Sequence, residues 1–299
     1  MIGAAETERR SGNMKKLTAV AAALAVLLAL LAGCAKKTET AEDGSAADEM
    51  RVTFFDVGKG DCILIEKDGA FVLIDAGYAD TSDDVIAFLK ERGVETLDEM
   101  IVTHYDKDHV GGASAVAEAF GVTQLLLPAY AGSSKHYTAL MKTVVERNLT
   151  YRQVTEDVSF TLAGIEFTVF ASPVEYLAGD GEEEGNDNDV SLVVSAVYGE
   201  DSYLFAGDIE KAGISAYLAA GHGTFDVLKM PHHGGKEKNT DDLLANVSPQ
   251  IAVITDSADE PAEDAVLALL AQAGAETYRT AERGTVVITG SGTGTYSVA

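Results

Sequence analysis

Apolar positions along residues 50–299 alternate or cluster in short runs, which predicts many β-strands separated by helices. Strand patterns, either alternating or continuously apolar, cover residues 51–57, 62–66, 70–74, 100–102, 123–127, 158–162, 165–170, 190–197, 202–206, 225–230, 250–255, 285–289 and 295–298. Apolar residues spaced as on one helix face predict helices over 82–93, 113–120, 134–148 and 262–273. Hairpins with helices between them predict one α/β (α+β) domain, in which two mixed sheets are flanked by helices.

The first 49 residues follow a different pattern, which predicts export and attachment to a membrane. Lys15 and Lys16 precede an apolar run over residues 17–31, and Leu31-Ala32-Gly33-Cys34 follows. This order is typical of a secretory signal, and its ending resembles the bacterial lipobox, whose cysteine is lipid-modified. We expect residues 1–34 to be the signal and residues 35–49 a flexible tether outside the cytoplasm. A retained anchor is the alternative, although the run is short for a span of about twenty residues, and Met14 is an alternative start.

The densest group of potential metal ligands follows the buried strand at residues 100–102. Four such residues occupy six positions and are followed by two glycines that allow a tight turn: His104, Asp106, Asp108, His109, Gly111 and Gly112. Imidazole and carboxylate groups suit zinc, manganese or iron. Because alternate side chains at a strand exit can point to one place, the spacing predicts a metal site rather than a solvated polar loop.

Three other strand ends carry residues that would complete such a site. Asp208 follows a glycine at the end of one strand and can bridge two cations, unless it caps the helix expected near residue 209. His232 and His233 follow another strand, and because adjacent side chains diverge, one is expected to bind metal and the other to contact substrate or the residues that support the ligands. Asp75 ends a third strand and is a candidate hydrogen-bond acceptor for a ligand histidine.

These motifs resemble the metallo-β-lactamase superfamily and, within it, the extracellular metallo-hydrolase domain of the ComEC competence proteins. The resemblance is carried, in consistent order over residues 50–299, by residues 55–61, 103–112, 205–208 and 228–234. It implies an αββα sandwich, with His104 and Asp106 at a first metal, and with Asp108, His109 and one of His232 and His233 at a second. Asp208 would lie between the two ions.

The sequence departs from the superfamily pattern in three places. Asp106 stands where the second histidine of His-x-His-x-Asp-His is usual, and the middle histidine before the bridging aspartate has no counterpart in residues 186–191. The Tyr-Gly-His-Pro-like stretch is replaced by residues 258–261. A first site richer in oxygen favours manganese, or a single ion, over a zinc pair. We therefore expect one or two divalent ions, zinc or manganese.

The expected chemistry is hydrolysis by metal-activated water, which Asp106 or Asp108 would orient. The resemblance implies phosphodiester cleavage in DNA or nucleotides. The alternatives are an envelope phosphoesterase acting on cell-wall or teichoic-acid phosphodiesters and a non-catalytic, metal-stabilised binding module. The formal net charge of −26 disfavours a tight nucleic-acid binder. Lysines beside the motifs nevertheless predict a cationic rim for a phosphate-containing substrate, unless they are ordinary solvated residues: Lys107, Lys229, Lys236 and Lys238.

The remaining candidates have structural or supporting roles. Asn188 and Ser191 adjoin a core strand and are expected to line the site. Residues 179–189 are the most acidic run but do not match a calcium loop, so a solvated loop is favoured. Cys62 is expected in the core, and His136 and His222 are incidental. No stable protein partner is expected.

The lipobox interpretation predicts that Cys34→Ala leaves an unprocessed or released protein, because the lipid acceptor is removed. Membrane fractionation and mass spectrometry of the N-terminus measure this outcome. A variant that is processed and membrane-bound like the parent would contradict the interpretation.

Overall fold

The computed structural model describes residues 48–178 and 186–299. The predicted signal, Cys34 and nearly all of the expected tether lie outside the described residues, as does most of the acidic loop. Within the described ranges, none of the helices combines the length and the apolar character that a bilayer crossing requires.

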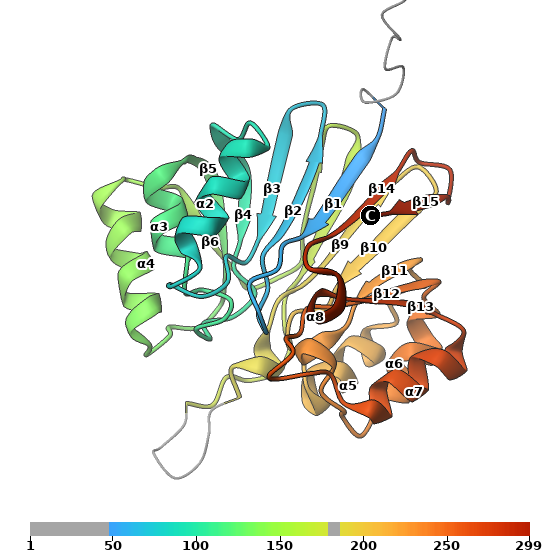
Figure 1. Cartoon of the computed structure of the whole chain (residues 1–299). Helices are drawn as coiled ribbons and strands as arrows, with labels where there is room; N and C mark the ends of the chain where they lie inside the picture. The colour runs from blue at the N-terminus through green and yellow to red at the C-terminus, as the bar shows by residue number, and fades with distance from the viewer. Residues whose placement is uncertain (1–47, 179–185) are drawn as a thin grey trace, which may run out of the picture. The chain divides into compact units, whose positions relative to one another are not determined.

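Two β-sheets form the centre of the fold over the described residues (Figure 1). The eight strands of the first sheet are, in spatial order, β15 (Tyr296–Val298), β14 (Val286–Gly290), β1 (Met50–Phe54), β2 (Ile63–Lys67), β3 (Ala70–Ile74), β4 (Thr96–Ile101), β5 (Gly121–Pro128) and β6 (Tyr151–Val154). The seven strands of the second are β13 (Glu276–Arg279), β12 (Ile251–Ile254), β11 (Val227–Lys229), β10 (Asp201–Phe205), β9 (Val193–Tyr198), β8 (Ile165–Phe170) and β7 (Val158–Leu162). Both sheets are mixed, with parallel pairing from β3 to β6 and from β10 to β13.

Helices cover the outer face of each sheet (Figure 1). The first sheet carries α2 (Ser82–Glu91), α3 (Ala113–Ala119) and α4 (Lys135–Glu146), and the second carries α5 (Lys211–Ala220), α6 (Thr240–Val247) and α7 (Asp264–Ala273). Three short elements complete the described chain: η1 (Asn188–Val190), η2 (Pro231–Gly234) and α8 (Thr280–Arg283). The predicted αββα sandwich is therefore confirmed.

The apolar patterns arise because both faces of the sheets are covered. In β1, Met50, Val52 and Phe54 are fully buried and belong to the cluster between the sheets. In β2, Leu64 points the other way and packs with the helices of the first layer. A strand buried on both faces loses the alternation of a half-exposed strand, which is why several segments are continuously apolar.

The sequence located most elements but missed several and shifted others. The hairpin β7–β8 has the predicted bounds, whereas β9 begins at Val193 rather than at Val190, which belongs to η1. Strands β6 and β13 and helix α6 were not predicted, whereas α5 follows the position near residue 209 where a helix was expected. Strand β6 is largely exposed, so its pattern carries little apolar signal. Helix α2 begins at Ser82, close to the predicted start, and the preceding Thr81 makes no side-chain cap hydrogen bond.

Strand ends from both sheets meet at one edge, and this edge carries the polar residues. In the first sheet β3 leads into Asp75, and its parallel neighbour β4 leads into the segment with His104 and His109. In the second sheet β10 leads into Asp208 and its parallel neighbour β11 leads into η2. Because parallel strands end at the same edge of a sheet, residues far apart in the chain come together there.

Close backbone packing explains the paired glycines at this edge. A side chain at Gly111 would collide with the carbonyl oxygen of Lys107, and one at Gly112 with that of Ala76. The turn after β4 therefore lies directly against the loop after β3, and glycine is needed for this close approach rather than for an unusual φ.

Candidate metal centre

Four side chains at the sheet edge bring ligand atoms into one small volume: Asp108, His109, Asp208 and His233. The Nε2 atoms of the two histidines are 3.3 Å apart. Oδ2 of Asp208 lies 3.1 Å from Nε2 of His109 and 3.0 Å from Nε2 of His233. Oδ2 of Asp108 lies 3.4 Å from Nε2 of His233 and 4.0 Å from that of His109.

These distances fit the donor set of a tetrahedral metal ion. Nitrogen and oxygen ligands bind zinc at about 2.0–2.2 Å, which places tetrahedral ligand atoms about 3.3–3.6 Å from one another. The observed separations of 3.0–4.0 Å include that range. Two imidazoles and two carboxylates are also acceptable to manganese and iron. The described residues therefore fit one divalent ion with four protein ligands.

Hydrogen bonds on the far side of each imidazole orient its Nε2 atom toward the cluster. Nδ1 of His109 donates to Oδ2 of Asp75 at 2.8 Å, and Nδ1 of His233 donates to the carbonyl oxygen of Thr255 at 2.9 Å. Asp75 is itself held by Thr103, whose backbone N–H and hydroxyl both donate to it. Such outer contacts fix the tautomer and the ring orientation of a ligand histidine.

The cluster has a strongly negative potential because several buried carboxylates share it. Burial by itself lowers the pKa of His109, but the neighbouring carboxylates of Asp208 and Asp75 raise it well above its usual value. Burial raises the pKa of Asp208, yet the two histidines and Lys229 hold it well below its usual range. The potential that retains protons on buried imidazoles also favours binding of a divalent cation.

His104 and Asp106 lie beside the four-residue group but do not join it. His104 is fully buried, its ring centroid is 4.1 Å from that of His109, and its Nε2 atom has no hydrogen-bond partner among the described residues. Oδ2 of the partly exposed Asp106 lies 3.8 Å away. Burial and Asp108 raise the pKa of Asp106 to about 6, while burial and His109 lower that of His104 well below its usual value. This position therefore offers two protein ligands, one nitrogen and one carboxylate.

The structure separates the two adjacent histidines of η2. Both have positive φ, 46° at His232 and 51° at His233, a strained backbone that functional sites often retain. His233 is buried in the ligand cluster, whereas Nδ1 of the partly exposed His232 contacts Oε1 of Glu210 at 3.2 Å. His232 groups with Glu210 and Glu237 instead. The sequence predicts that only one of the pair joins the centre, and in the structure that residue is His233.

Asp208 connects the ligand cluster to a buried lysine. Its Oδ2 faces the histidines, and its Oδ1 lies 3.3 Å from Nζ of Lys229. It does not cap α5, whose N-cap residue is Glu210, so that alternative is excluded. Bridging of two ions by Asp208 stays a prediction, and with Oδ1 beside Lys229 it would use Oδ2.

Lys229 is not part of a cationic rim, which corrects the sequence-based expectation. Its side chain is 0% exposed because β11 is buried on both faces, and its ammonium group pairs with Asp61 and Asp208. Asp61, which the sequence did not single out, also accepts a hydrogen bond from the Thr255 hydroxyl at 2.6 Å. Its sequence signals were its place at the end of residues 55–61, a stretch that carries the resemblance, and its position in a glycine-rich turn directly before an apolar strand.

The other predicted residues lie around the centre in different settings. Oγ of Ser191 accepts a hydrogen bond from the backbone N–H of Asp208 at 3.4 Å, and Asn188 donates to Glu210. Lys236 Nζ donates to the carbonyl oxygen of Glu237, and Lys238 and Lys107 are exposed. Cys62 is buried, as expected, and burial raises the pKa of its thiol.

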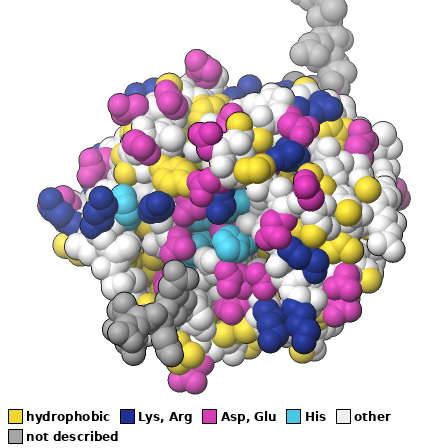
Figure 2. Space-filling view, turned by 60° about the horizontal axis from the view of Figure 1, so that its bottom comes forward, with side chains coloured by type: hydrophobic (Ala, Val, Ile, Leu, Met, Phe, Trp, Pro, Cys, Tyr) yellow, Lys and Arg dark blue, Asp and Glu magenta, His cyan; other side chains and the backbone are white. Residues whose placement is uncertain are grey.

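Figure 2 shows histidine side chains in the middle of one face, with acidic side chains around them and basic side chains close by. The profile of the metallo-β-lactamase superfamily matches residues 55–254, a span that includes all four clustered candidate ligands. The chain belongs to the metallo-β-lactamase superfamily. Its members are generally metal-dependent hydrolases, which agrees with the donor set found here.

Known competence proteins are among the relatives in sequence. The chain is 29% identical over 210 residues to Recombination protein 2 of Haemophilus influenzae, covering 69% of this chain and 24% of that protein. It is 25% identical over 262 residues to ComE operon protein 3 of Bacillus subtilis, covering 80% and 33%, and 27% identical to Competence protein ComA of Neisseria gonorrhoeae, covering 69% and 27%. The chain thus spans at most a third of these relatives' lengths.

Solved structures support the fold. The metallo-β-lactamase fold protein YhfI of Bacillus subtilis superimposes with a TM-score of 0.55 at 12% identity, covering 81% of this chain and all of that one. Zn(2+)-bound PqqB of Methylobacterium extorquens gives 0.52 at 13% identity, covering 77% and 97%. At these identities the likeness concerns the fold alone.

The geometry predicts different outcomes for the two adjacent histidines. His233→Ala removes a ligand nitrogen from the centre of the cluster and should reduce tightly bound metal to a small fraction of the parental content. His232→Ala, the matched control, should retain it. Elemental analysis after gel filtration measures both, and equal losses would contradict the assignment of His233.

The buried ion pairs predict strong coupling between Lys229 and Asp61. Lys229→Met leaves two carboxylates buried without a counter-charge and should lower the free energy of unfolding by about 3–5 kcal/mol. Adding Asp61→Asn removes one unpaired charge and should recover part of that loss. Urea denaturation of the single and double variants measures the coupling, and strictly additive losses would rule it out.

Proposed function

We propose that the protein is a metal-dependent hydrolase that cleaves phosphodiesters in nucleic acids or nucleotides. The observation that carries the proposal is the convergence of four ligand atoms, two nitrogens and two oxygens, at the edge of a metallo-β-lactamase sandwich. The similarity to recombination and competence proteins supports a nucleic-acid or nucleotide substrate. The bound ions would be zinc or manganese, one at the four-ligand position and optionally a second at His104 and Asp106.

A divalent ion held there would supply Lewis-acid polarisation of a phosphoryl oxygen and a water of lowered pKa. The residues of this chain would orient the metal ligands and accept a proton during the reaction. Asp75 and Thr255 hold the two ligand imidazoles in fixed orientations. Asp106 is partly exposed beside the cluster, and its pKa of about 6 allows it to accept a proton near neutral pH.

Lysines close in sequence to the candidate ligands support a phosphate-containing substrate. Lys107 is exposed one residue before the ligand Asp108, and Lys236 and Lys238 follow η2 by a few residues. Lys229 contributes no rim charge, because it is buried and paired. The rim is therefore smaller than the sequence suggested, and it favours an anionic group held near the metal over a long polyanion wrapped on the surface.

Cellular location forms part of the proposal. The basic start, the apolar run and Leu31-Ala32-Gly33-Cys34 support an exported protein held to the membrane by a lipid on Cys34. Such a protein would meet extracellular DNA, nucleotides or envelope polymers.

The metal-loaded full chain should hydrolyse chromogenic phosphodiesters and dinucleotides. Asp108→Ala should lower kcat/KM by more than about 100-fold, which exceeds the loss typical of substitutions at residues that only support the metal ligands. His136→Ala, which alters a histidine outside the cluster, is the matched control and should retain activity. Release of nitrophenol and of nucleotide products measures turnover.

Two outcomes would redirect the proposal. Cleavage of glycerol-phosphate polymers without cleavage of nucleotides would indicate the envelope phosphoesterase. Metal binding without turnover of any phosphodiester, with Asp108→Ala unchanged in every assay except metal content, would indicate a metal-stabilised binding module.

A further inference from the structure

A second group of potential metal ligands lies beside the four-residue cluster and shares no residue with it. The group consists of Glu210, His232 and Glu237, each of which offers one ligand atom within 4.8 Å of the others. Nδ1 of His232 lies 3.2 Å from Oε1 of Glu210. All three side chains are partly exposed, so a group bound between them would remain in contact with water.

Three connections of the second sheet meet at this group. Glu210 lies between β10 and α5, His232 lies in η2 after β11, and Glu237 lies between η2 and α6. Asp208 and His233 of the first cluster come from two of the same connections, and the ring centroids of His232 and His233 are 6.3 Å apart. The two groups are therefore neighbours that short stretches of backbone join.

The two carboxylates of the group have no permanent positive charge between them. Within the described residues, no lysine or arginine forms an ion pair with Glu210 or Glu237, and the imidazole of His232 is the partner that Glu210 has. Burial and the carboxylate of Glu210 raise the pKa of Glu237, because the two negative charges repel each other. A divalent cation between the carboxylates would remove this repulsion.

A buried amide oxygen without a partner adjoins the same group. Nδ2 of Asn188, a residue of η1, donates to Oε1 of Glu210 at 3.0 Å. Oδ1 of the same amide is buried and has no hydrogen-bond partner in the described part of the chain. A buried acceptor without a partner is unfavourable, and amide oxygens also bind divalent cations. A cation beside Glu210 would give this oxygen a partner.

We propose that Glu210, His232 and Glu237 bind a divalent cation at a site distinct from the four-residue cluster. One imidazole nitrogen and two carboxylates form a donor set that suits zinc or manganese, with water as the remaining ligand. Such binding does not require phosphodiester hydrolysis and goes beyond the proposed function. The ion would hold η2 against the connection after β10, and would thereby support the positions of Asp208 and His233.

The two groups should differ in affinity, which allows their ions to be measured separately. Three partly exposed ligands should release their ion during gel filtration, whereas the buried cluster of four should keep its own. Equilibrium dialysis of the gel-filtered full chain against Zn²⁺ therefore measures the weaker ion, and we expect the chain to take up at least one more ion than it retains after gel filtration. No further uptake at saturating Zn²⁺ would overturn the proposal.

Substitutions in the group should weaken the further zinc ion selectively. Glu237→Gln keeps the shape of the side chain but removes a ligand charge, and it should raise the Kd of this ion by at least the roughly tenfold change typical of losses around a metal site. His232→Asn should have a similar effect, because it removes the imidazole while asparagine tolerates the φ of 46° at this position. Asp241→Asn, the matched control, removes one negative charge at an exposed position of α6 outside the group and should leave the Kd unchanged.

The position at His104 and Asp106 is the competing location for a weaker ion. Asp106→Asn should retain the ion that Glu237→Gln loses. Loss of this ion in Asp106→Asn together with its retention in Glu237→Gln would assign it to the competing position and overturn the proposal. Equal Kd values in Glu237→Gln, His232→Asn and the parent would overturn it as well.

Thermal unfolding separates metal binding from a purely structural role of the three side chains. Excess Zn²⁺ should raise the Tm of the gel-filtered parent, because a ligand that binds the native state stabilises it, and it should raise that of Glu237→Gln much less. Without added metal, Glu237→Gln should unfold at the same or a higher temperature than the parent, since the repulsion from Glu210 is removed. A lower Tm with an unchanged response to Zn²⁺ would assign the group to the stability of the fold and overturn the metal site.

Discussion

Compensation of buried negative charge is the constraint on which the site depends. Asp61, Asp75 and Asp208 are each no more than 2% exposed, and they lie within contact distance of the same two imidazoles or of one lysine. Isolated carboxylates would be very costly in such surroundings. They are retained because every one has a partner: the threonine hydroxyl and backbone at Asp75, the ammonium of Lys229 at Asp61 and Asp208, and the histidines at the centre.

This arrangement also explains why the cluster suits a divalent ion. Lys229 satisfies only the oxygen of Asp208 that faces away from the histidines. The oxygens that face inward, from Asp108 and Asp208, are matched by imidazoles whose Nε2 atoms can coordinate only when they carry no proton. A metal can replace those protons with two positive charges at one point, and the surrounding hydrogen bonds already hold the rings in place.

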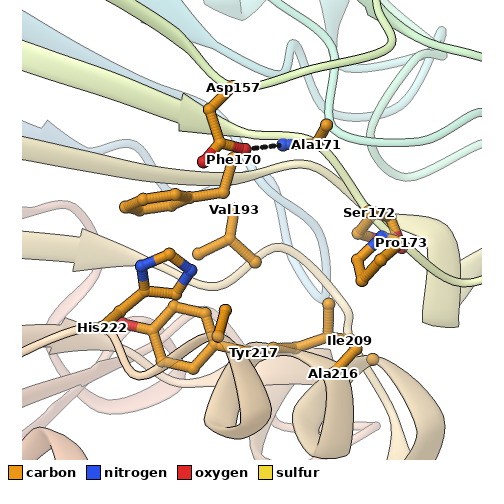
Figure 3. A pocket seen from close by; sticks show the side chains of 13 residues that line it. Asp157, Phe170, Ala171, Ser172, Pro173, Val193, Ile209, Ala216, Tyr217 and His222 are labelled. Atoms are coloured by element: carbon orange, nitrogen blue, oxygen red, sulfur yellow. Dashed lines mark hydrogen bonds between the residues drawn. The ribbon is translucent and has the colours of Figure 1, made fainter.

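The candidate metal centre borders two different environments in the sandwich. On one side the centre opens toward exposed acidic and basic groups, which Figure 2 shows on one face. On the other side Ser191 and Ile209 separate it from a cavity along α5 that Phe170 and Tyr217 also line (Figure 3). Asp208 and Ile209 are adjacent at the end of β10 but face different surroundings: Asp208 contacts the two clustered imidazoles, and Ile209 lines the cavity.

The sequence alone determined the layered fold and pointed to most of the candidate ligand residues, because strand periodicity and the density of histidine and aspartate after one buried strand are local signals. The tertiary structure decided what depends on contacts between distant segments. It selected His233 over His232 through the backbone of η2, and it buried Lys229 against Asp61 across 168 positions of chain. It also brought His222, incidental in sequence, against Phe170 and Tyr217. No local pattern encodes these pairings, since they arise only where the ends of two sheets meet and a helix closes over them.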